Sequence, residues 1–120
     1  MTGASSGLGR RAAEVLALAG AKVVGVARRE EALENLALEL GEKFSFISAD
    51  ISDRSLLRDL REKINSKFGS PDILVHAAGV NTRQTADEVT DLGWDQTISL
   101  NLSTPFFLSQ LLVPEMKKKG

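Results

Sequence analysis

The sequence has 120 residues, which suits one domain. We expect residues 1–120 to form a single partial dinucleotide-binding unit. Its 15 basic and 16 acidic residues nearly cancel and are scattered, which argues against nucleic acid or an anionic membrane as a partner. Cysteine and tyrosine are absent and histidine occurs once, which excludes disulfides, thiol catalysis, a phenolic proton donor and zinc sites rich in cysteine and histidine.

No segment approaches the roughly 18 uninterrupted apolar residues of a membrane helix, and no secretory signal opens the chain. We therefore expect a cytoplasmic protein that acts on small molecules and has no metal site.

The first half of the chain alternates helices and strands. A Gly/Ser loop opens a helix over Leu8–Ala19, where apolar residues recur at helical spacing and Gly20 follows as a stop. The β-branched run Lys22–Ala27 predicts a buried strand, and Glu30–Leu40 predicts a second helix with one leucine-rich face. Phe44–Ala49 predicts another strand.

The second half continues the alternation. Ser52, with Asp53 in the first turn, is expected to cap a helix that runs to Phe68, and Ile73–His76 is expected to form a third strand. After a polar loop, Leu92–Lys119 should be mostly helical, and Pro105 and Pro114 should kink or interrupt it.

This order predicts an α/β fold, a doubly wound parallel sheet that is Rossmann-like. Only Met1 precedes the opening loop, where such a sheet needs its central first strand. We therefore expect the sheet to be incomplete at both ends, either because the numbering begins inside a longer chain or because this is a truncated product.

The opening loop places glycines immediately before a helix, in the run Thr2-Gly3-Ala4-Ser5-Ser6-Gly7-Leu8-Gly9. Glycine can take positive φ and lacks Cβ, so the backbone can approach a diphosphate held by free amides at the helix start. The spacing differs from G-x-G-x-x-G, and a Gly/Ser loop that merely caps a helix is the alternative interpretation.

The pattern Thr-Gly-x-x-x-Gly-x-Gly resembles the cofactor loop of the short-chain dehydrogenase/reductase family, in its single-domain branch. Further motifs match in order: Asp50-Ile51, which in the family contacts adenine; His76-Ala77-Ala78-Gly79, at the end of a strand; and Trp94 and Asn101 in a long helix. The resemblance implies an oxidoreductase that transfers hydride between a nicotinamide dinucleotide and a carbonyl or secondary alcohol. The candidate cofactor-binding residues are Thr2, Gly3, Ser5, Ser6, Gly7, Leu8, Gly9, Arg28, Arg29, Asp50, Ile51, His76, Ala77, Ala78 and Gly79.

Arg28 and Arg29 lie where an acidic residue would select NAD, close to the expected spacing of about 20 residues. A guanidinium pairs with the 2′-phosphate of NADP, so we expect NADP in preference to NAD. Alternatively, both arginines only cover the next helix and are neutralised by Glu30 and Glu31.

The family uses a Tyr, a Lys four residues later, a Ser and an Asn, and only the Asn, matched by Asn101, lies within this sequence. The resemblance implies that Asn101 completes a proton relay, whereas the alternative is a helix residue satisfied locally. The other three should follow Gly120, so these 120 residues alone are expected to be inactive. His76 lies where the family usually has an Asn. We expect it to replace the hydrogen bond that this amide makes between strands rather than to act as a substitute acid.

Two functions therefore compete: the enzyme just described, expected to form a homo-oligomer through the last helix, and an inactive module for dinucleotide binding or dimerisation. A third, a different phosphate-binding α/β protein, is less favoured because no G-x-x-x-x-G-K-[ST] loop is present.

Overall fold

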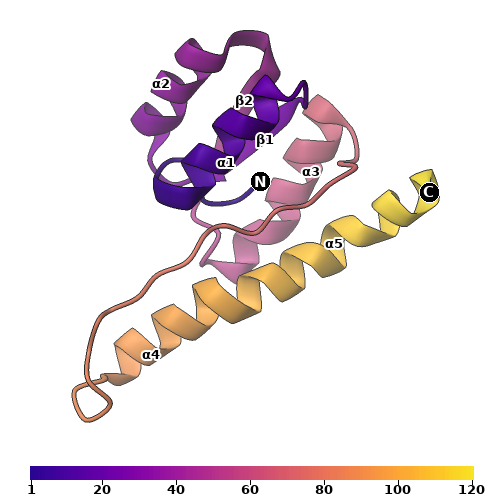
Figure 1. Ribbon diagram of the computed structural model, residues 1–120. Coiled ribbons are helices and arrows are strands. Elements are labelled where there is room, and N and C mark those ends of the chain that lie inside the picture. The colour runs from indigo at the N-terminus through magenta and orange to yellow at the C-terminus, as the bar shows by residue number, and fades with distance from the viewer.

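Residues 1–120 are described by a computed structural model in which helices lie on both sides of short parallel strands (Figure 1). The elements are α1 (Gly7–Leu18), β1 (Val23–Ala27), α2 (Glu30–Leu40), β2 (Phe44–Ser48), α3 (Leu57–Phe68), α4 (Asp91–Ile98) and α5 (Thr104–Lys119). The predicted alternation through α3 is confirmed, with boundaries that differ by no more than one residue up to β2 and by several residues at the start of α3.

The strands β1 and β2 pair in parallel, with Val23 opposite Phe44. On the other side of β1, Thr2 forms parallel bridges with both Val26 and His76. The order across the layer is therefore β2, β1, the Met1–Thr2 segment and the end of the 73–76 segment, all running in one direction. This is the central part of a doubly wound sheet.

The predicted strand Ile73–His76 is wrong in extent, because only His76 forms a bridge. Its one neighbour in the layer is the Met1–Thr2 segment, in which the Thr2 amide donates a hydrogen bond to the Val75 carbonyl at 2.9 Å. Strand structure requires a ladder of such bonds, and Ile73 and Leu74 have no adjacent backbone to complete it.

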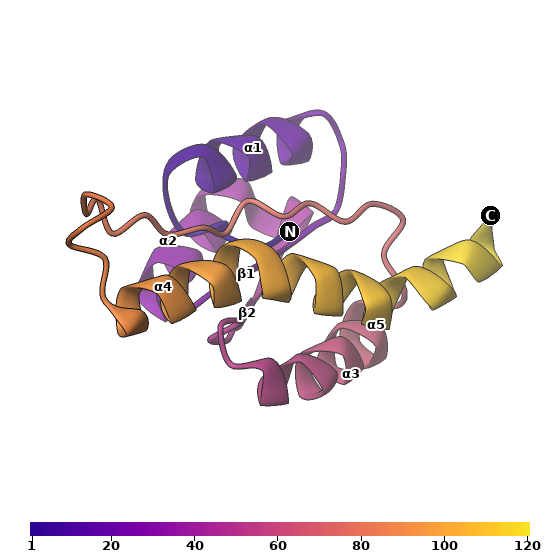
Figure 2. The same ribbon diagram turned by 90° about the horizontal axis from the view of Figure 1, so that it is seen from below.

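Side chains of β1 alternate between two hydrophobic clusters on opposite faces. Val23 and Ala27 pack with α1 and α2, including the fully buried Leu33 and Leu36, whereas Val26 packs with α3 and α5. Because successive side chains of a strand point to opposite faces, a short apolar strand can serve both clusters at once. The helices of the two faces are separated in both views (Figures 1 and 2).

The start of α3 differs from expectation. Asp53, not Ser52, is the cap: its carboxylate accepts from the Ser55 amide at 2.9 Å, and a 3-10 turn (Arg54–Leu56) precedes α3. Ser52 is not free for this role, because its amide and hydroxyl both donate to Asp50.

The last helices form one rod, whose middle is a π-helical segment (Ser99–Ser103) between α4 and α5 (Figure 1). Pro105 is the second residue of α5 and directly follows the π-helical segment, so the rod continues through it. Contrary to expectation, Pro114 does not interrupt α5. Pro114 and Gln110 are both exposed, so water can satisfy the carbonyl that loses its partner.

None of the helices combines the length and the apolar character that crossing a bilayer requires.

Candidate functional site

The loop between Thr2 and α1 is built on close backbone contacts. Gly3 has φ of +71°, and a Cβ there would lie 2.6 Å from the Ala78 amide nitrogen. At Gly9 a Cβ would overlap the Gly3 carbonyl. Both positions therefore require glycine, and together they bring the first turn of α1 against the 77–78 backbone.

Helix α1 begins directly after this loop and presents its first-turn amides at the same place. Ser6, the N-cap, is extended, and its side chain makes no capping hydrogen bond. The amides of the first turn have no acceptor within the helix, and the helix dipole adds positive potential there. This arrangement suits an anionic group.

These amides face a groove of about 750 Å³ along the carboxyl ends of the strands. Each wall is the segment that follows one strand, as expected for ligand sites in open parallel sheets. The lining residues are Gly3, Ser5, Ser6, Leu8 and Gly9; Val26–Arg29; Ala49–Ser52; Ala77–Val80; and Gln96 and Leu100.

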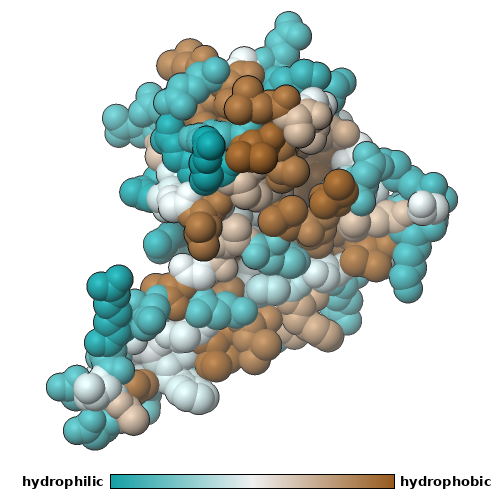
Figure 3. Space-filling view, in the orientation of Figure 1, coloured by the Kyte–Doolittle hydropathy of each residue, from teal (hydrophilic) through white to brown (hydrophobic).

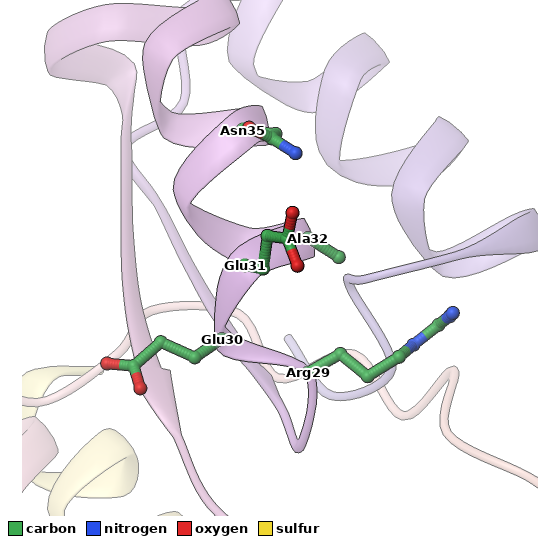
Figure 4. Close-up of a pocket in the computed structure, with 5 residues that line it drawn as sticks. All are labelled: Arg29, Glu30, Glu31, Ala32 and Asn35. Carbon is green, nitrogen blue, oxygen red and sulfur yellow. The ribbon is translucent and has the colours of Figure 1, made fainter.

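Arg28 and Arg29 follow β1 and line the groove. Arg29 also borders a smaller depression of about 360 Å³ at the start of α2, where its side chain and that of Glu30 point in opposite directions (Figure 4). The ion pairs of the structure include neither Arg28 nor Arg29. Glu30 and Glu31 therefore form no direct ion pair with either arginine.

Asp50 follows β2 and lies on the same side of the groove as Arg28. Its carboxylate accepts from the Ser52 hydroxyl at 2.6 Å and from the Ser52 amide at 3.0 Å. The Ser52 hydroxyl bond is the main cause that lowers the pKa of Asp50, and the positive charge of Arg28 adds to it. Asp50 is thus ionised at neutral pH and holds its loop in a tight turn.

Asn101 lies in the π-helical segment, and its side chain forms two hydrogen bonds with the backbone of Val80. Its side-chain oxygen accepts from the Val80 amide, and its side-chain nitrogen donates to the Val80 carbonyl, both at 2.8 Å. The amide group is therefore satisfied across the chain rather than within its own helix. The clamp fixes the segment that leaves Gly79 and lines the groove.

His76 lies outside the groove lining and bonds through Nε2 to the Ser109 hydroxyl on α5 at 2.9 Å. The expected bond between strands is wrong, because a strand side chain projects out of the sheet toward the helix layer. Burial is the main cause that lowers the pKa of His76. A neutral imidazole beneath the groove serves as a structural link.

The structure brings most of the sequence-predicted residues to the groove, and four are not among its lining residues. Thr2 is 2% exposed, and its hydroxyl accepts from the Ala78 amide at 3.3 Å, while Gly7, His76 and Asn101 also lie outside the lining. Sequence reasoning missed seven lining residues: Val26, Ala27, Ala49, Ser52, Val80, Gln96 and Leu100. The i, i+4 spacing of Gln96 and Leu100, ending one residue before Asn101, was the available signal.

The arrangement can bind an extended anionic ligand, with free amides at its centre and two unpaired arginines at one end. No tyrosine is present to deliver a proton. A nicotinamide dinucleotide fits these features, because the glycines leave room for a diphosphate and the groove is open on both sides of it.

Comparison with known proteins places the chain among close relatives. The sequence model of the family described as short chain dehydrogenase matches residues 1–120. A 3-oxoacyl-acyl-carrier-protein reductase of Escherichia coli is 37% identical over 119 residues, which are 99% of this chain and 49% of that protein. A 2-dehydro-3-deoxy-D-gluconate 5-dehydrogenase of Dickeya dadantii is 38% identical, and the alignment covers 100% of this chain and 48% of that protein.

Solved structures agree. L-sorbose reductase of Gluconobacter frateurii, complexed with NADPH and L-sorbose, superimposes with a TM-score of 0.92 at 34% identity, covering 100% of this chain and 47% of that one. The chain thus spans about half the length of the curated relatives it matches.

Proposed function

The chain belongs to the short-chain dehydrogenase/reductase family over its whole length, and from this premise we propose that it forms the cofactor-binding part of an NAD(P)-dependent oxidoreductase. In the whole protein, hydride passes between the nicotinamide and a carbonyl or secondary alcohol. The dinucleotide supplies or accepts the hydride, and residues 1–120, as one partial domain, hold and orient it.

One observation carries the proposal: the free first-turn amides of α1 open onto a groove that runs along the ends of all the strands. The diphosphate is held by the amides from Gly3 to Gly9. Ala77, Ala78 and Gly79 support the nicotinamide half, and Asp50 and Ile51 support the adenine. The proton-relay role that the resemblance implies for Asn101 remains a prediction.

The cofactor is NADP rather than NAD. Arg28 and Arg29 supply two guanidinium groups without a carboxylate partner, and a 2′-phosphate offers each of them a charge-assisted bond. The relative that was crystallised with NADPH is consistent with this choice.

The partners that follow are a small carbonyl or alcohol substrate and further copies of the same protein. Trp94, Leu102 and Phe106 are 60%, 63% and 60% exposed along the rod of α4, the π-helical segment and α5, and hydrophobic surface is visible on this rod (Figure 3). The same face favours a second candidate, in which the chain is a binding or dimerisation module without turnover. A cytoplasmic location remains a prediction.

The proposal is tested by placing a negative charge at the entrance of the groove. Ser6→Asp keeps a favoured N-cap residue and so preserves α1, but its carboxylate repels the diphosphate. We expect NADPH to bind at least about tenfold more weakly, measured by the change in nicotinamide fluorescence.

Ser6→Asn is the matched control, because asparagine caps equally well and carries no charge. It should bind NADPH within about threefold of the wild type, a difference worth under 1 kcal/mol. Wild-type protein that fails to bind NADPH or NADH, or equal binding by Ser6→Asp and Ser6→Asn, would refute the proposed function.

A further inference from the structure

Two hydroxyl groups of the long helical rod bind the loop at one end of the groove. The Thr104 hydroxyl donates to the Ile51 carbonyl at 2.6 Å, and the Ser99 hydroxyl donates to the Ser52 carbonyl at 2.8 Å. The carbonyls are consecutive, and both belong to the 50–52 loop that follows β2 and lines the groove.

The Thr104 contact is buried. Thr104 is 3% exposed and Ile51 is 4% exposed, so neither polar atom of this bond can turn to water instead. A buried carbonyl that loses its donor costs more than an exposed one, and the bond therefore holds the loop firmly.

The π-helical segment makes this double contact possible. In an α-helix, residues five apart point about 140° away from each other, so positions 99 and 104 would not face the same loop. A π-helix closes its turn between residue i and residue i+5, which brings these positions to nearly the same face.

The same widened turn also carries Asn101, which clamps Val80 on the opposite wall of the groove. One five-residue segment thus contacts both walls: the 50–52 loop through hydroxyls and Val80 through an amide. A single stretch of helix, residues 99–104, therefore holds backbone groups of both lining segments.

We propose that Ser99 and Thr104 are positioning residues that fix the base-binding end of the groove and thereby set affinity for the adenosine half of the cofactor. This inference rests on the proposed function. In the proposed function, the 50–52 loop contacts the adenine and Arg28 contacts the 2′-phosphate. Both follow the paired strands β2 and β1 and line the groove, so the adenosine half of the cofactor lies at this end. Neither hydroxyl lines the groove, so both act through the loop.

The test uses the complete protein and two half-cofactors, adenosine 2′,5′-bisphosphate and reduced nicotinamide mononucleotide, titrated by calorimetry. Thr104→Val keeps the shape of the side chain and removes the donor. We expect it to weaken the adenosine compound about tenfold, and Ser99→Ala to weaken it about threefold, with the nicotinamide compound within twofold of wild type.

Two variants serve as controls. Thr104→Ser retains the hydroxyl and should restore binding of the adenosine compound. Thr97→Val removes a hydroxyl bonded at 2.8 Å to the Gly93 carbonyl within the same helix, and should leave both half-cofactors unaffected. Hydrogen exchange of residues 49–53 in the free protein should rise in Thr104→Val and not in Thr97→Val.

Unchanged adenosine binding in both variants, or equal losses for the two half-cofactors, would overturn the inference and leave the proposed function intact. A wild-type protein that binds neither half-cofactor nor NADPH would overturn the proposed function and this inference with it.

Discussion

Arg28 is the residue that we propose selects between the two cofactors. It lines the groove after the end of β1, it forms no ion pair with a carboxylate, and its positive charge contributes to lowering the pKa of Asp50. A free guanidinium at this site attracts a phosphate, whereas a carboxylate would repel it.

We predict that Arg28→Asp weakens NADPH by about 10- to 100-fold, because a charge-assisted bond is replaced by repulsion. Binding of NADH should change much less, since it carries a hydroxyl in place of the phosphate. Arg58→Asp, an equivalent substitution at an exposed residue of α3 outside the groove lining, is the control. Equal losses for both dinucleotides would contradict the assignment of Arg28.

His76 gives the protein a pH dependence of stability with a definite sign. Its pKa in the folded state lies below 6.5, the value of the unfolded chain, because burial disfavours the charged ring. Below pH 6.5 the unfolded state binds a proton that the folded state resists, so the free energy of unfolding falls.

His76→Gln places an amide group near the position of Nε2, where it can pair with Ser109, and does not titrate. We predict that the wild type loses more stability than this variant between pH 7.5 and pH 5.5, measured by urea unfolding at both values. His76 is the single histidine of the sequence, so the difference is assigned to it. Parallel pH profiles for the two proteins would show that the buried ring does not control this dependence.

At the scale of elements, the π-helical segment is the feature that joins distant parts of the chain. Asn101 ties α4 and α5 to the segment after Gly79 through two hydrogen bonds to Val80. Without these two hydrogen bonds, the segment from Val80 to the start of α4 would lose its contact with the Asn101 side chain.

We predict that Asn101→Ala lowers the free energy of unfolding by about 1 kcal/mol, the net loss of two hydrogen bonds after the better helix propensity of alanine is counted. Asn35→Ala, at an exposed site of α2 with no side-chain bond, isolates the propensity gain and should be slightly stabilising. Chemical denaturation measures both. An Asn101→Ala protein as stable as Asn35→Ala would mean that the Val80 bonds contribute nothing.

At the scale of the whole molecule, the rod of α4 and α5 has a buried face and an exposed apolar face. Leu108 and Leu112 are buried against α3, while Trp94, Leu102 and Phe106 remain exposed. An exposed apolar stripe of this kind is where we expect association with another copy of the protein.

We predict that Phe106→Asp shifts the complete protein toward the monomer, because a carboxylate cannot be buried in an apolar contact without a partner. Sedimentation velocity measures the change. Phe68→Asp places the same charge on a partly exposed phenylalanine at the end of α3 and should leave the assembly state unaltered. Identical sedimentation of Phe106→Asp and wild type would exclude this face as the interface.

The amino-acid sequence by itself determined the alternation of helices and strands, the glycine loop and the arginines after β1. These features depend on local spacing: apolar periodicity, glycine at positive φ, and the residue that follows a strand. The helix from about Glu30 to Leu40 was predicted for this reason and is confirmed.

Only the tertiary structure decided how His76, Ser52 and the 73–76 segment are used, and where the long helix widens. Each depends on a partner remote in sequence: Ser109 for His76, Asp50 for Ser52 once its loop is in place, and Met1–Thr2 for the third strand. The π-helical segment likewise forms where Ser99, Asn101 and Thr104 all find backbone groups on other elements. Hydrogen bonds between distant segments produce no periodic pattern of residues in the sequence. They could therefore be identified only from the tertiary structure.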